Sequence, residues 1–248
     1  MKKLAFCFLI YDEINREDLW NVFFKNIDPL LYSIYIHYKW NNPLKYFETY
    51  KLKNCIDTQL GDISLVKAQN LMIEEGLKDD NTHFIFLSNS CIPLKSFDFI
   101  YNFLQDYSYF NVCSQFKLFP KDYSFPFDNS LLENRFIRKA HQWCILNRKH
   151  AQLMVEKTYY LHWFDRVWAT DEFCYITNIY ANGMENEIIT TPNLSNDATT
   201  FTNWGGMDYK YGHDGCVKMY SEISHEELSY LRNSKCLFGR KFMKECLF

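Results

Sequence analysis

The sequence lacks the features of a nucleic-acid-coating or membrane-spanning protein. Its 248 residues carry a net charge of only −3, without the basic excess that binding a nucleic acid requires. No apolar run approaches the roughly 20 residues of a membrane span. The run after the two N-terminal lysines covers about eight residues, has no small-residue cleavage site and meets Asp12 and Glu13, so it predicts a strand rather than a signal peptide. We therefore expect a cytoplasmic protein, attached to a membrane at most peripherally.

Motifs for several common chemistries are also missing. The nine cysteines, an odd number, include no C-x-x-C pair and no His–Cys group with zinc spacing. This favours free thiols in a reducing compartment and leaves a disulfide framework open. The sequence has no G-x-G-x-x-G motif, no P-loop and no G-x-S-x-G elbow. It therefore lacks the usual signatures of dinucleotide binding, P-loop ATP hydrolysis and α/β-hydrolase chemistry.

The first half of the chain contains alternating strand and helix patterns. Short apolar runs predict strands at 3–11, 32–39 and 84–87. Apolar residues at helical spacing predict helices at 15–27, 61–79 and 96–107. This order predicts an α/β fold with a mostly parallel sheet flanked by helices.

Two of these helices have a predicted buried face. In helix 15–27 the expected apolar residues are Leu19, Val22 and Phe23. Helix 61–79 has Asp62 or Ser64 as its expected N-cap. Its expected apolar stripe consists of Leu65, Ala68, Met72 and Ile73.

The second half is less regular. Residues 116–140 hold prolines, charges and aromatics without a period, which predicts a long loop of functional type. The patterns that follow predict a strand at 143–146, helices from Arg148, at 171–183 and from Ser224, and short strands at 187–193, 199–204 and 236–242. No linker or repeat interrupts the chain, so we expect a single domain over 1–248.

The strand at 84–87 ends in Ser88, Asn89 and Ser90. In open α/β sheets, ligands bind beyond the carboxyl ends of the strands. Many enzymes place two aspartates at such an end to hold a metal on a diphosphate, and here both are missing. Either the chain handles no diphosphate, or it neutralises one without a metal. Asp79 and Asp80 precede the strand, at the wrong end of the sheet, and we expect them in a solvated loop.

Two groups of charged residues could carry chemistry. Asp171 and Glu172 stand where a helix is predicted to begin; Thr170 or Asp171 could cap that helix, or a carboxylate could deprotonate a hydroxyl. Cations within strand-like segments are costly to bury unless they are paired. Their heads either reach solvent or point into a pocket that holds an anion. These cations are Lys218, Arg240 and Lys241.

Several segments together resemble a known family. In order, they are GDISLVKAQ, FIFLSNSCIPLKSF, HQWCILNRKHA, TDEF, FTNW and CLFGRKF. The set resembles the core-2/I-branching β-1,6-N-acetylglucosaminyltransferases, a family that includes the peptide O-xylosyltransferases, over residues 3–242. The resemblance implies a GT-A type fold, with a nucleotide-sugar-binding half at about 1–112 and an acceptor-binding half at about 113–248. It also implies an inverting, single-displacement reaction that needs no metal.

The resemblance assigns roles to residues. Lys241 matches a family lysine that binds the diphosphate, and Lys218 stands where the family has an arginine, with Arg240 able to compensate. Glu172 matches the family's general base. The other donor-binding residues are Leu9, Ser88 and Asn89, and the acceptor-binding residues are Trp204, Gln142, Trp143 and Asp171.

The expected activity is transfer of a sugar from a UDP-sugar to a glycan hydroxyl, with GlcNAc as the favoured sugar. Tyr38 and Lys39 stand where the family often has an aspartate that contacts the base, so UDP-xylose and UDP-glucose stay open as donors. Two further alternatives are an inactive glycan-binding protein of the same fold and a metal-dependent enzyme that uses Asp171. Animal members carry a membrane anchor and disulfides that we cannot match here, which favours a cytoplasmic enzyme.

Overall fold

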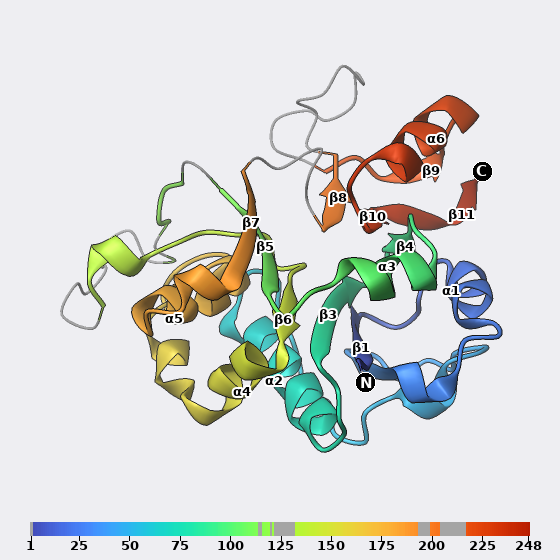
Figure 1. Ribbon diagram of the computed structural model, residues 1–248. Coiled ribbons are helices and arrows are strands. Elements are labelled where there is room, and N and C mark those ends of the chain that lie inside the picture. Colours follow the sequence, from blue (N-terminus) through green and yellow to red (C-terminus); the bar gives the residue numbers. More distant parts are fainter. Residues whose placement is uncertain (1, 114–115, 120, 122–131, 193–198, 204–216) are drawn as a thin grey trace.

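A six-stranded, mostly parallel sheet forms the centre of the molecule in the computed structural model (Figure 1). The structure describes residues 2–113, 116–119, 121, 132–192, 199–203 and 217–248. The strand order is β2-β1-β3-β6-β5-β7, and β6 runs antiparallel to both of its neighbours. The strands are β1 (Leu4–Ile10), β2 (Tyr32–Tyr38), β3 (His83–Ser88), β5 (Ser108–Val112), β6 (Ile145–Asn147) and β7 (Ile188–Pro192).

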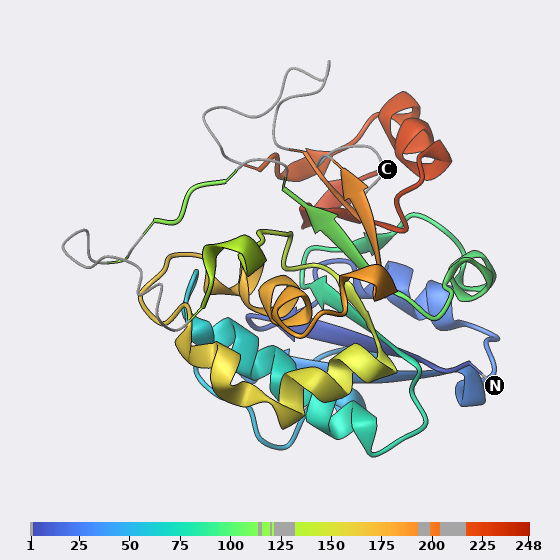
Figure 2. The same ribbon diagram turned by 60° about the vertical axis from the view of Figure 1, so that its left-hand side comes forward.

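Helices cover both faces of this sheet, which confirms the predicted α/β class. They are α1 (Glu17–Phe24), α2 (Ile63–Leu77), α3 (Phe97–Phe103), α4 (Arg148–Glu156) and α5 (Cys174–Ala181). A further helix, α6 (His225–Asn233), packs with residues of the small C-terminal sheets instead. Side chains alternate along a strand, so Ala5 and Cys7 of β1 pack on the face of α2, α4 and α5, while Phe6 and Phe8 pack towards α1 and α3. Figure 2 shows α2 and α4 side by side on the first face. None of the described helices combines the length and the apolar character that crossing a bilayer would require.

The predicted face of α1 is wrong in part: Leu19 and Phe23 are partly buried against the core, but Val22 is not. The buried residues are Trp20 and Phe24, whereas Val22 is 66% exposed. The pair at positions i and i+4 turns the helix so that the indole N–H of Trp20 donates to the Cys91 carbonyl at 2.9 Å. The largest aromatic ring, which loses most apolar area to water when it is buried, therefore sets the orientation of the helix.

The prediction for α2 agrees better with the structure. The carboxylate of Asp62 accepts a hydrogen bond from the Ser64 N–H at 2.9 Å, so Asp62 is the N-cap. Ala68, Met72 and Ile73 are buried as expected, while Leu65 is only partly buried.

Two small sheets from the C-terminal part lie at one end of the central sheet (Figure 1). One contains β4 (Ile92–Pro93), β10 (Phe238–Arg240) and β8 (Thr200–Thr202), and the other contains β9 (Tyr220–Glu222) and β11 (Phe242–Leu247). The single strand predicted at 236–242 is thus two strands that meet at Lys241. The N–H of Phe242 donates to the Ser90 carbonyl at 2.9 Å, which fixes this junction beside the end of β3.

Gly61→Ala should destabilise the protein more than Gly183→Ala. Both glycines have a left-handed backbone, with φ of 66° and 67°. A Cβ on Gly183 would meet nothing within 4 Å, whereas one on Gly61 would lie 2.9 Å from the Trp168 ring. We expect a loss of about 1 to 2 kcal/mol from the backbone alone at Gly183, and about 1 kcal/mol more at Gly61. Urea unfolding measures both, and equal losses would contradict the close contact with Trp168.

Candidate active site

A cavity of about 250 Å³ lies beyond the carboxyl ends of β1 and β3. Five residues that the sequence assigned to the donor are in its wall: Leu9, Ser88, Asn89, Arg240 and Lys241. The rest of the wall consists of Ile10, Tyr11, Asn15, Thr58, Leu60, Leu65, Ser90, Gln142, Trp143, Met219 and Phe242. The position at the strand ends is where an α/β sheet binds its ligand.

The end of β3 forms a tight polar turn without carboxylates. The hydroxyls of Ser88 and Ser90 lie 3.1 Å apart, and the Cys91 N–H donates to the Ser88 carbonyl at 3.2 Å. The Asn89 side chain donates to the Asn15 side chain at 3.1 Å, and Asn15 donates in turn to the Phe242 carbonyl at 2.7 Å. This chain of amides ties the strand end to the junction that carries Lys241.

Arg240 and Lys241 supply the positive charge at this strand end. The Arg240 guanidinium carbon lies 4.9 Å from the centre of the Trp143 ring, within the range of a cation–π contact. Burial lowers the pKa of Arg240 from its ordinary value. Its Nε atom has no hydrogen-bond partner within the part of the chain that the structure describes. A buried cation of this kind is stabilised by an anion.

A second cavity, of about 710 Å³, adjoins the first. The two share Leu60, Gln142, Trp143, Arg240 and Lys241 in their walls. The second cavity adds Asp171 and Glu172, so that Glu172 and three predicted acceptor-binding residues, Gln142, Trp143 and Asp171, face one space. Its remaining wall residues are Gly61, Cys113, Phe116, Lys117, Phe119, Lys139, His141, Trp168, Ala169 and Val217.

Glu172 and Asp171 lie on a single 3₁₀ turn, Thr170–Glu172, rather than at the start of a helix, because α5 begins at Cys174. The alternative that Thr170 or Asp171 caps this helix is wrong. The Thr170 hydroxyl donates to the Gly61 carbonyl at 3.2 Å, and α5 has no side-chain cap. Ala169, just before the turn, has a left-handed φ of 59°, which costs about 1 to 2 kcal/mol for a residue with a Cβ.

The two neighbouring carboxyl groups have different surroundings. Glu172 Oε2 lies 2.9 Å from Lys139 Nζ in an ion pair. Asp171 Oδ1 is buried and has no hydrogen-bond partner among the described residues. Burial, together with the charge of Glu172, raises the pKa of Asp171 to about 7. Environments that differ between adjacent carboxyl groups are typical of sites that hold one as an acid and one as a base.

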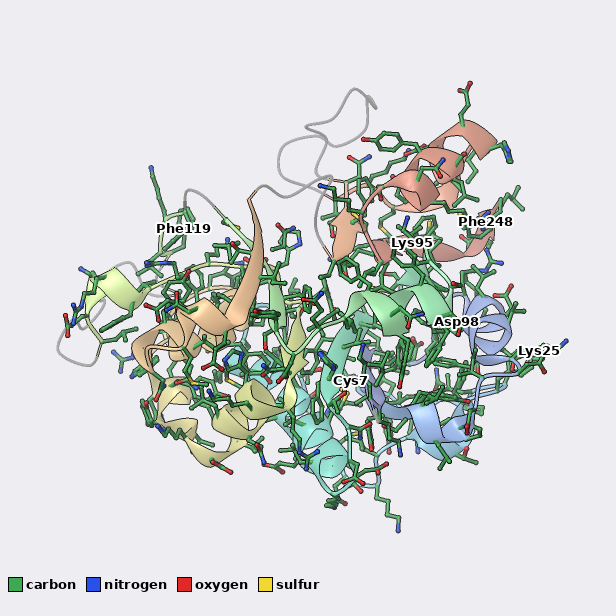
Figure 3. The ribbon with its side chains drawn as sticks, viewed as in Figure 1. Cys7, Lys25, Lys95, Asp98, Phe119 and Phe248 are labelled. Carbon is green, nitrogen blue, oxygen red and sulfur yellow. The ribbon has the colours of Figure 1, made fainter. Side chains whose placement is uncertain are left out.

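Sequence reasoning missed three wall residues: Lys139, His141 and Trp168. Lys139 lies at the end of the region predicted as a loop, and His141 just follows it. The two lie two residues apart on the same side of an extended segment, and this spacing was the available signal. Burial lowers the pKa of His141 to about 4, helped by the charges of Arg240 and Lys139. Trp168 lies three residues before Asp171, and its side chain is 51% exposed. Phe119, labelled in Figure 3 on the opposite side of the molecule from Phe248, is also 51% exposed at this cavity.

Two predicted site residues are not found in either cavity wall as described. Lys218 forms an ion pair with Glu227 at 3.2 Å and lies 4.3 Å from the Tyr220 ring. Its neighbours Val217 and Met219 line the cavities, but Lys218 is not among the described wall residues. Its contact with a diphosphate stays a prediction. Trp204 lies outside the described residues.

The described residues contain no group of three or more His, Cys, Asp or Glu that could hold a metal ion. Asp79 pairs with Lys3 away from both cavities, as expected for a loop residue. All eight cysteines in the described part of the chain are free thiols. That the reaction needs no metal stays a prediction.

The first cavity is lined by cations and hydroxyls, and it adjoins a second cavity that holds two carboxyl groups. The model of the core-2/I-branching enzyme family matches residues 4–232, so the chain belongs to this family. Together with the sheet order, this membership supports the predicted GT-A type fold.

Two known proteins are similar to this chain. Glycosyltransferase BC10 of Oryza sativa subsp. japonica is 28% identical over 162 residues, which cover 62% of this chain and 40% of that protein. The matched region therefore spans less than half the length of this relative. The solved structure of the galactosyltransferase LgtC, in complex with donor and acceptor sugar analogues, aligns with 95% of this chain and 86% of its own, at a TM-score of 0.45 and 7% identity. A likeness that weak carries no information about function.

Asp171→Asn should stabilise the protein more at pH 8 than at pH 4. The folded pKa of Asp171, about 7, lies above the ordinary value of an unfolded aspartate, so the folded state binds the proton more tightly. The contribution of Asp171 to stability is therefore complete below about pH 4 and is lost as the pH rises through 7. Asparagine has no proton to lose. The difference in unfolding free energy, variant minus wild type, should grow by about 2 to 4 kcal/mol between pH 4 and pH 8.

Urea unfolding at a series of pH values measures this difference. Asp165→Asn, which removes an exposed carboxylate, is the control, and its difference from wild type should vary less with pH. A constant difference for Asp171→Asn from pH 4 to pH 8 would contradict the raised pKa.

Proposed function

We propose that this chain is an inverting, metal-independent glycosyltransferase that transfers a sugar from a UDP-sugar to a glycan hydroxyl. The favoured sugar is GlcNAc. The observation that carries the proposal is the common wall of the two cavities. Arg240 and Lys241 belong to both, and Glu172 faces the second. A leaving diphosphate in the first cavity and an attacking hydroxyl in the second would meet at this wall.

The proposed reaction has one chemical step. The acceptor oxygen attacks the anomeric carbon from the face opposite the diphosphate, and its proton passes to the Glu172 carboxylate. The bond between the anomeric carbon and the β-phosphate oxygen breaks, and its electron pair stays on UDP. The configuration at the anomeric carbon is thereby inverted. Glu172 then loses the proton to solvent before the next turnover.

Charge on the leaving group grows as that bond breaks. Arg240 and Lys241 would stabilise it, and cations in a water-poor cavity act more strongly on a developing charge than they do in water. Lys218 would contribute from the neighbouring segment. The hydroxyls of Ser88 and Ser90 and the amide of Asn89 would hydrogen-bond the donor where other enzymes place a metal-binding aspartate pair.

The acceptor would lie in the larger cavity. Trp143 and Gln142 are in its wall beside Asp171, and sugars bind such sites through an apolar ring face and polar hydroxyls. The Gln142 Nε2 and Asp171 Oδ1 atoms lack hydrogen-bond partners among the described residues, as atoms that await a ligand or water would. Trp204 is proposed to complete this site.

Glu172→Gln should abolish most turnover and leave donor binding nearly intact, because the amide cannot accept the proton. We expect kcat to fall by about 100- to 10,000-fold and the Kd of UDP to stay within about twofold of wild type. UDP release from UDP-GlcNAc, UDP-xylose and UDP-glucose, with an array of glycan acceptors, measures turnover and identifies the donor.

Glu187→Gln, in an exposed ion pair with Lys149, is the matched control and should keep wild-type turnover. Wild-type kcat in Glu172→Gln would remove Glu172 from the mechanism. Wild-type protein that binds glycans but releases UDP from none of these donors would instead be an inactive glycan-binding member of the family.

Lys241→Met should weaken UDP binding by about 10- to 100-fold, the loss expected for one hydrogen bond between charged groups. Lys244→Met, three residues along β11, is the control, because Lys244 pairs with Glu13 at the surface. Calorimetry with UDP, in EDTA and in manganese, gives the Kd values. Wild-type affinity in Lys241→Met would refute the role of this lysine, and UDP binding that needs manganese would refute the metal-free mechanism.

A further inference from the structure

We propose that Lys139 is a positioning residue for the catalytic step, which holds the Glu172 carboxylate in place by its ion pair. This inference rests on the proposed role of Glu172 as the base. The ammonium of Lys139 lies 2.9 Å from Glu172 Oε2, and both side chains line the acceptor cavity. With one oxygen held by Lys139, the other is left to receive the proton of the acceptor hydroxyl.

The backbone around Lys139 is fixed on the side of the central sheet. Residues 139–141 run antiparallel to the end of β5. The Cys113 N–H donates to the Lys139 carbonyl at 2.8 Å, and the His141 N–H donates to the Asn111 carbonyl at 2.9 Å. Lys139 therefore starts from a sheet-like segment, which holds a side chain more firmly than a loop does.

The same segment is also bonded to the elements that carry Glu172. The Ala140 N–H donates to the Glu172 carbonyl at 2.8 Å. The Thr177 hydroxyl of α5 bonds both the N–H and the carbonyl of Arg138, at 3.0 and 3.1 Å. Both ends of the ion pair thus belong to backbones that are hydrogen-bonded to each other. The backbones from which Lys139 and Glu172 extend are therefore held at a fixed relative position, which lowers the cost of bringing the two side chains together.

This pair differs from the ion pairs on the surface. The side chains of Lys139 and Glu172 are 26% and 23% exposed, whereas those of Lys149 and Glu187 are 61% and 37% exposed. Screening by water means that exposed ion pairs contribute little to stability, whereas partial burial strengthens the attraction between the two charges. The Lys139 ammonium also lies over the Phe173 ring, 5.6 Å from its centre, in a cation–π contact.

The neighbouring charges explain why a cation is needed there. Asp171 is next to Glu172 on the same turn, and two adjacent carboxylates repel each other. Lys139 forms an ion pair with Glu172, whereas its charge and that of Arg240 act on Asp171 without an ion pair recorded among the described residues. The other charged or titratable groups in this wall are Cys113, Lys117, His141, Arg240 and Lys241. Lys139 is the one that the structure places in an ion pair with Glu172.

The test compares Lys139→Met, which removes the charge at similar length, with Lys139→Arg, which keeps it. UDP release from the best donor of the array gives kcat and donor KM. We expect Lys139→Met to lower kcat by about 10- to 100-fold with donor KM within about twofold, because a misplaced base slows chemistry and not donor binding. Lys139→Arg should recover most of the loss. Lys149→Met, from the exposed pair, should behave as wild type.

A double variant separates positioning from a merely structural role. If Lys139 acts through Glu172, then Lys139→Met should slow Glu172→Gln by less than about twofold, since the base is already gone. Independent effects would multiply. Melting temperatures are measured for each variant, and Lys139→Gln replaces Lys139→Met if the latter is unfolded at the assay temperature.

The outcomes distinguish the two proposals. A wild-type kcat in Lys139→Met or Lys139→Gln, failure of Lys139→Arg to recover turnover, or multiplied losses in the double variant would overturn the role of Lys139 alone. Wild-type turnover in Glu172→Gln would overturn the proposed base itself, whatever the lysine variants do.

Discussion

The candidate site depends on the hydrogen bonds that hold the C-terminal segment against the end of β3. The Phe242 N–H reaches the Ser90 carbonyl, and the Asn15 side chain reaches the Phe242 carbonyl. These bonds place the junction of β10 and β11, with Arg240 and Lys241, over a strand end that has no carboxylate of its own. Residues more than 140 positions apart in the sequence thus form one electrostatic site, because the junction of β10 and β11 is hydrogen-bonded to the end of β3.

The strand end of this protein differs from a metal-binding one in the source of its positive charge, which comes from side chains rather than from a metal ion. A strand end with two aspartates needs a bound cation before an anion can approach it. A strand end made of serine and asparagine presents no negative charge, so cations from the chain itself suffice. Those cations are then costly without a ligand, and the contact of Arg240 with the Trp143 ring offsets part of that cost.

Local patterns predicted much of this molecule from sequence. The strands at 84–87 and 32–39 and the helix capped by Asp62 follow from apolar period and capping, which are local signals. The face of α1 was misjudged because the deciding contact, between Trp20 and Cys91, joins distant segments. Glu172 and Lys241 were found by resemblance, and the structure brings them to one site. Lys139 was missed because its importance lies in a contact with Glu172, 33 residues away by sequence number, which no local pattern encodes.

The shared wall between the two cavities has a thermodynamic consequence. Leu60, Gln142, Trp143, Arg240 and Lys241 belong to both binding sites, so a ligand that moves or orders any of them changes the affinity of the neighbouring site. Linkage requires that this coupling free energy be the same in both directions. A donor that orders Arg240 would strengthen acceptor binding by the same factor by which the acceptor strengthens donor binding.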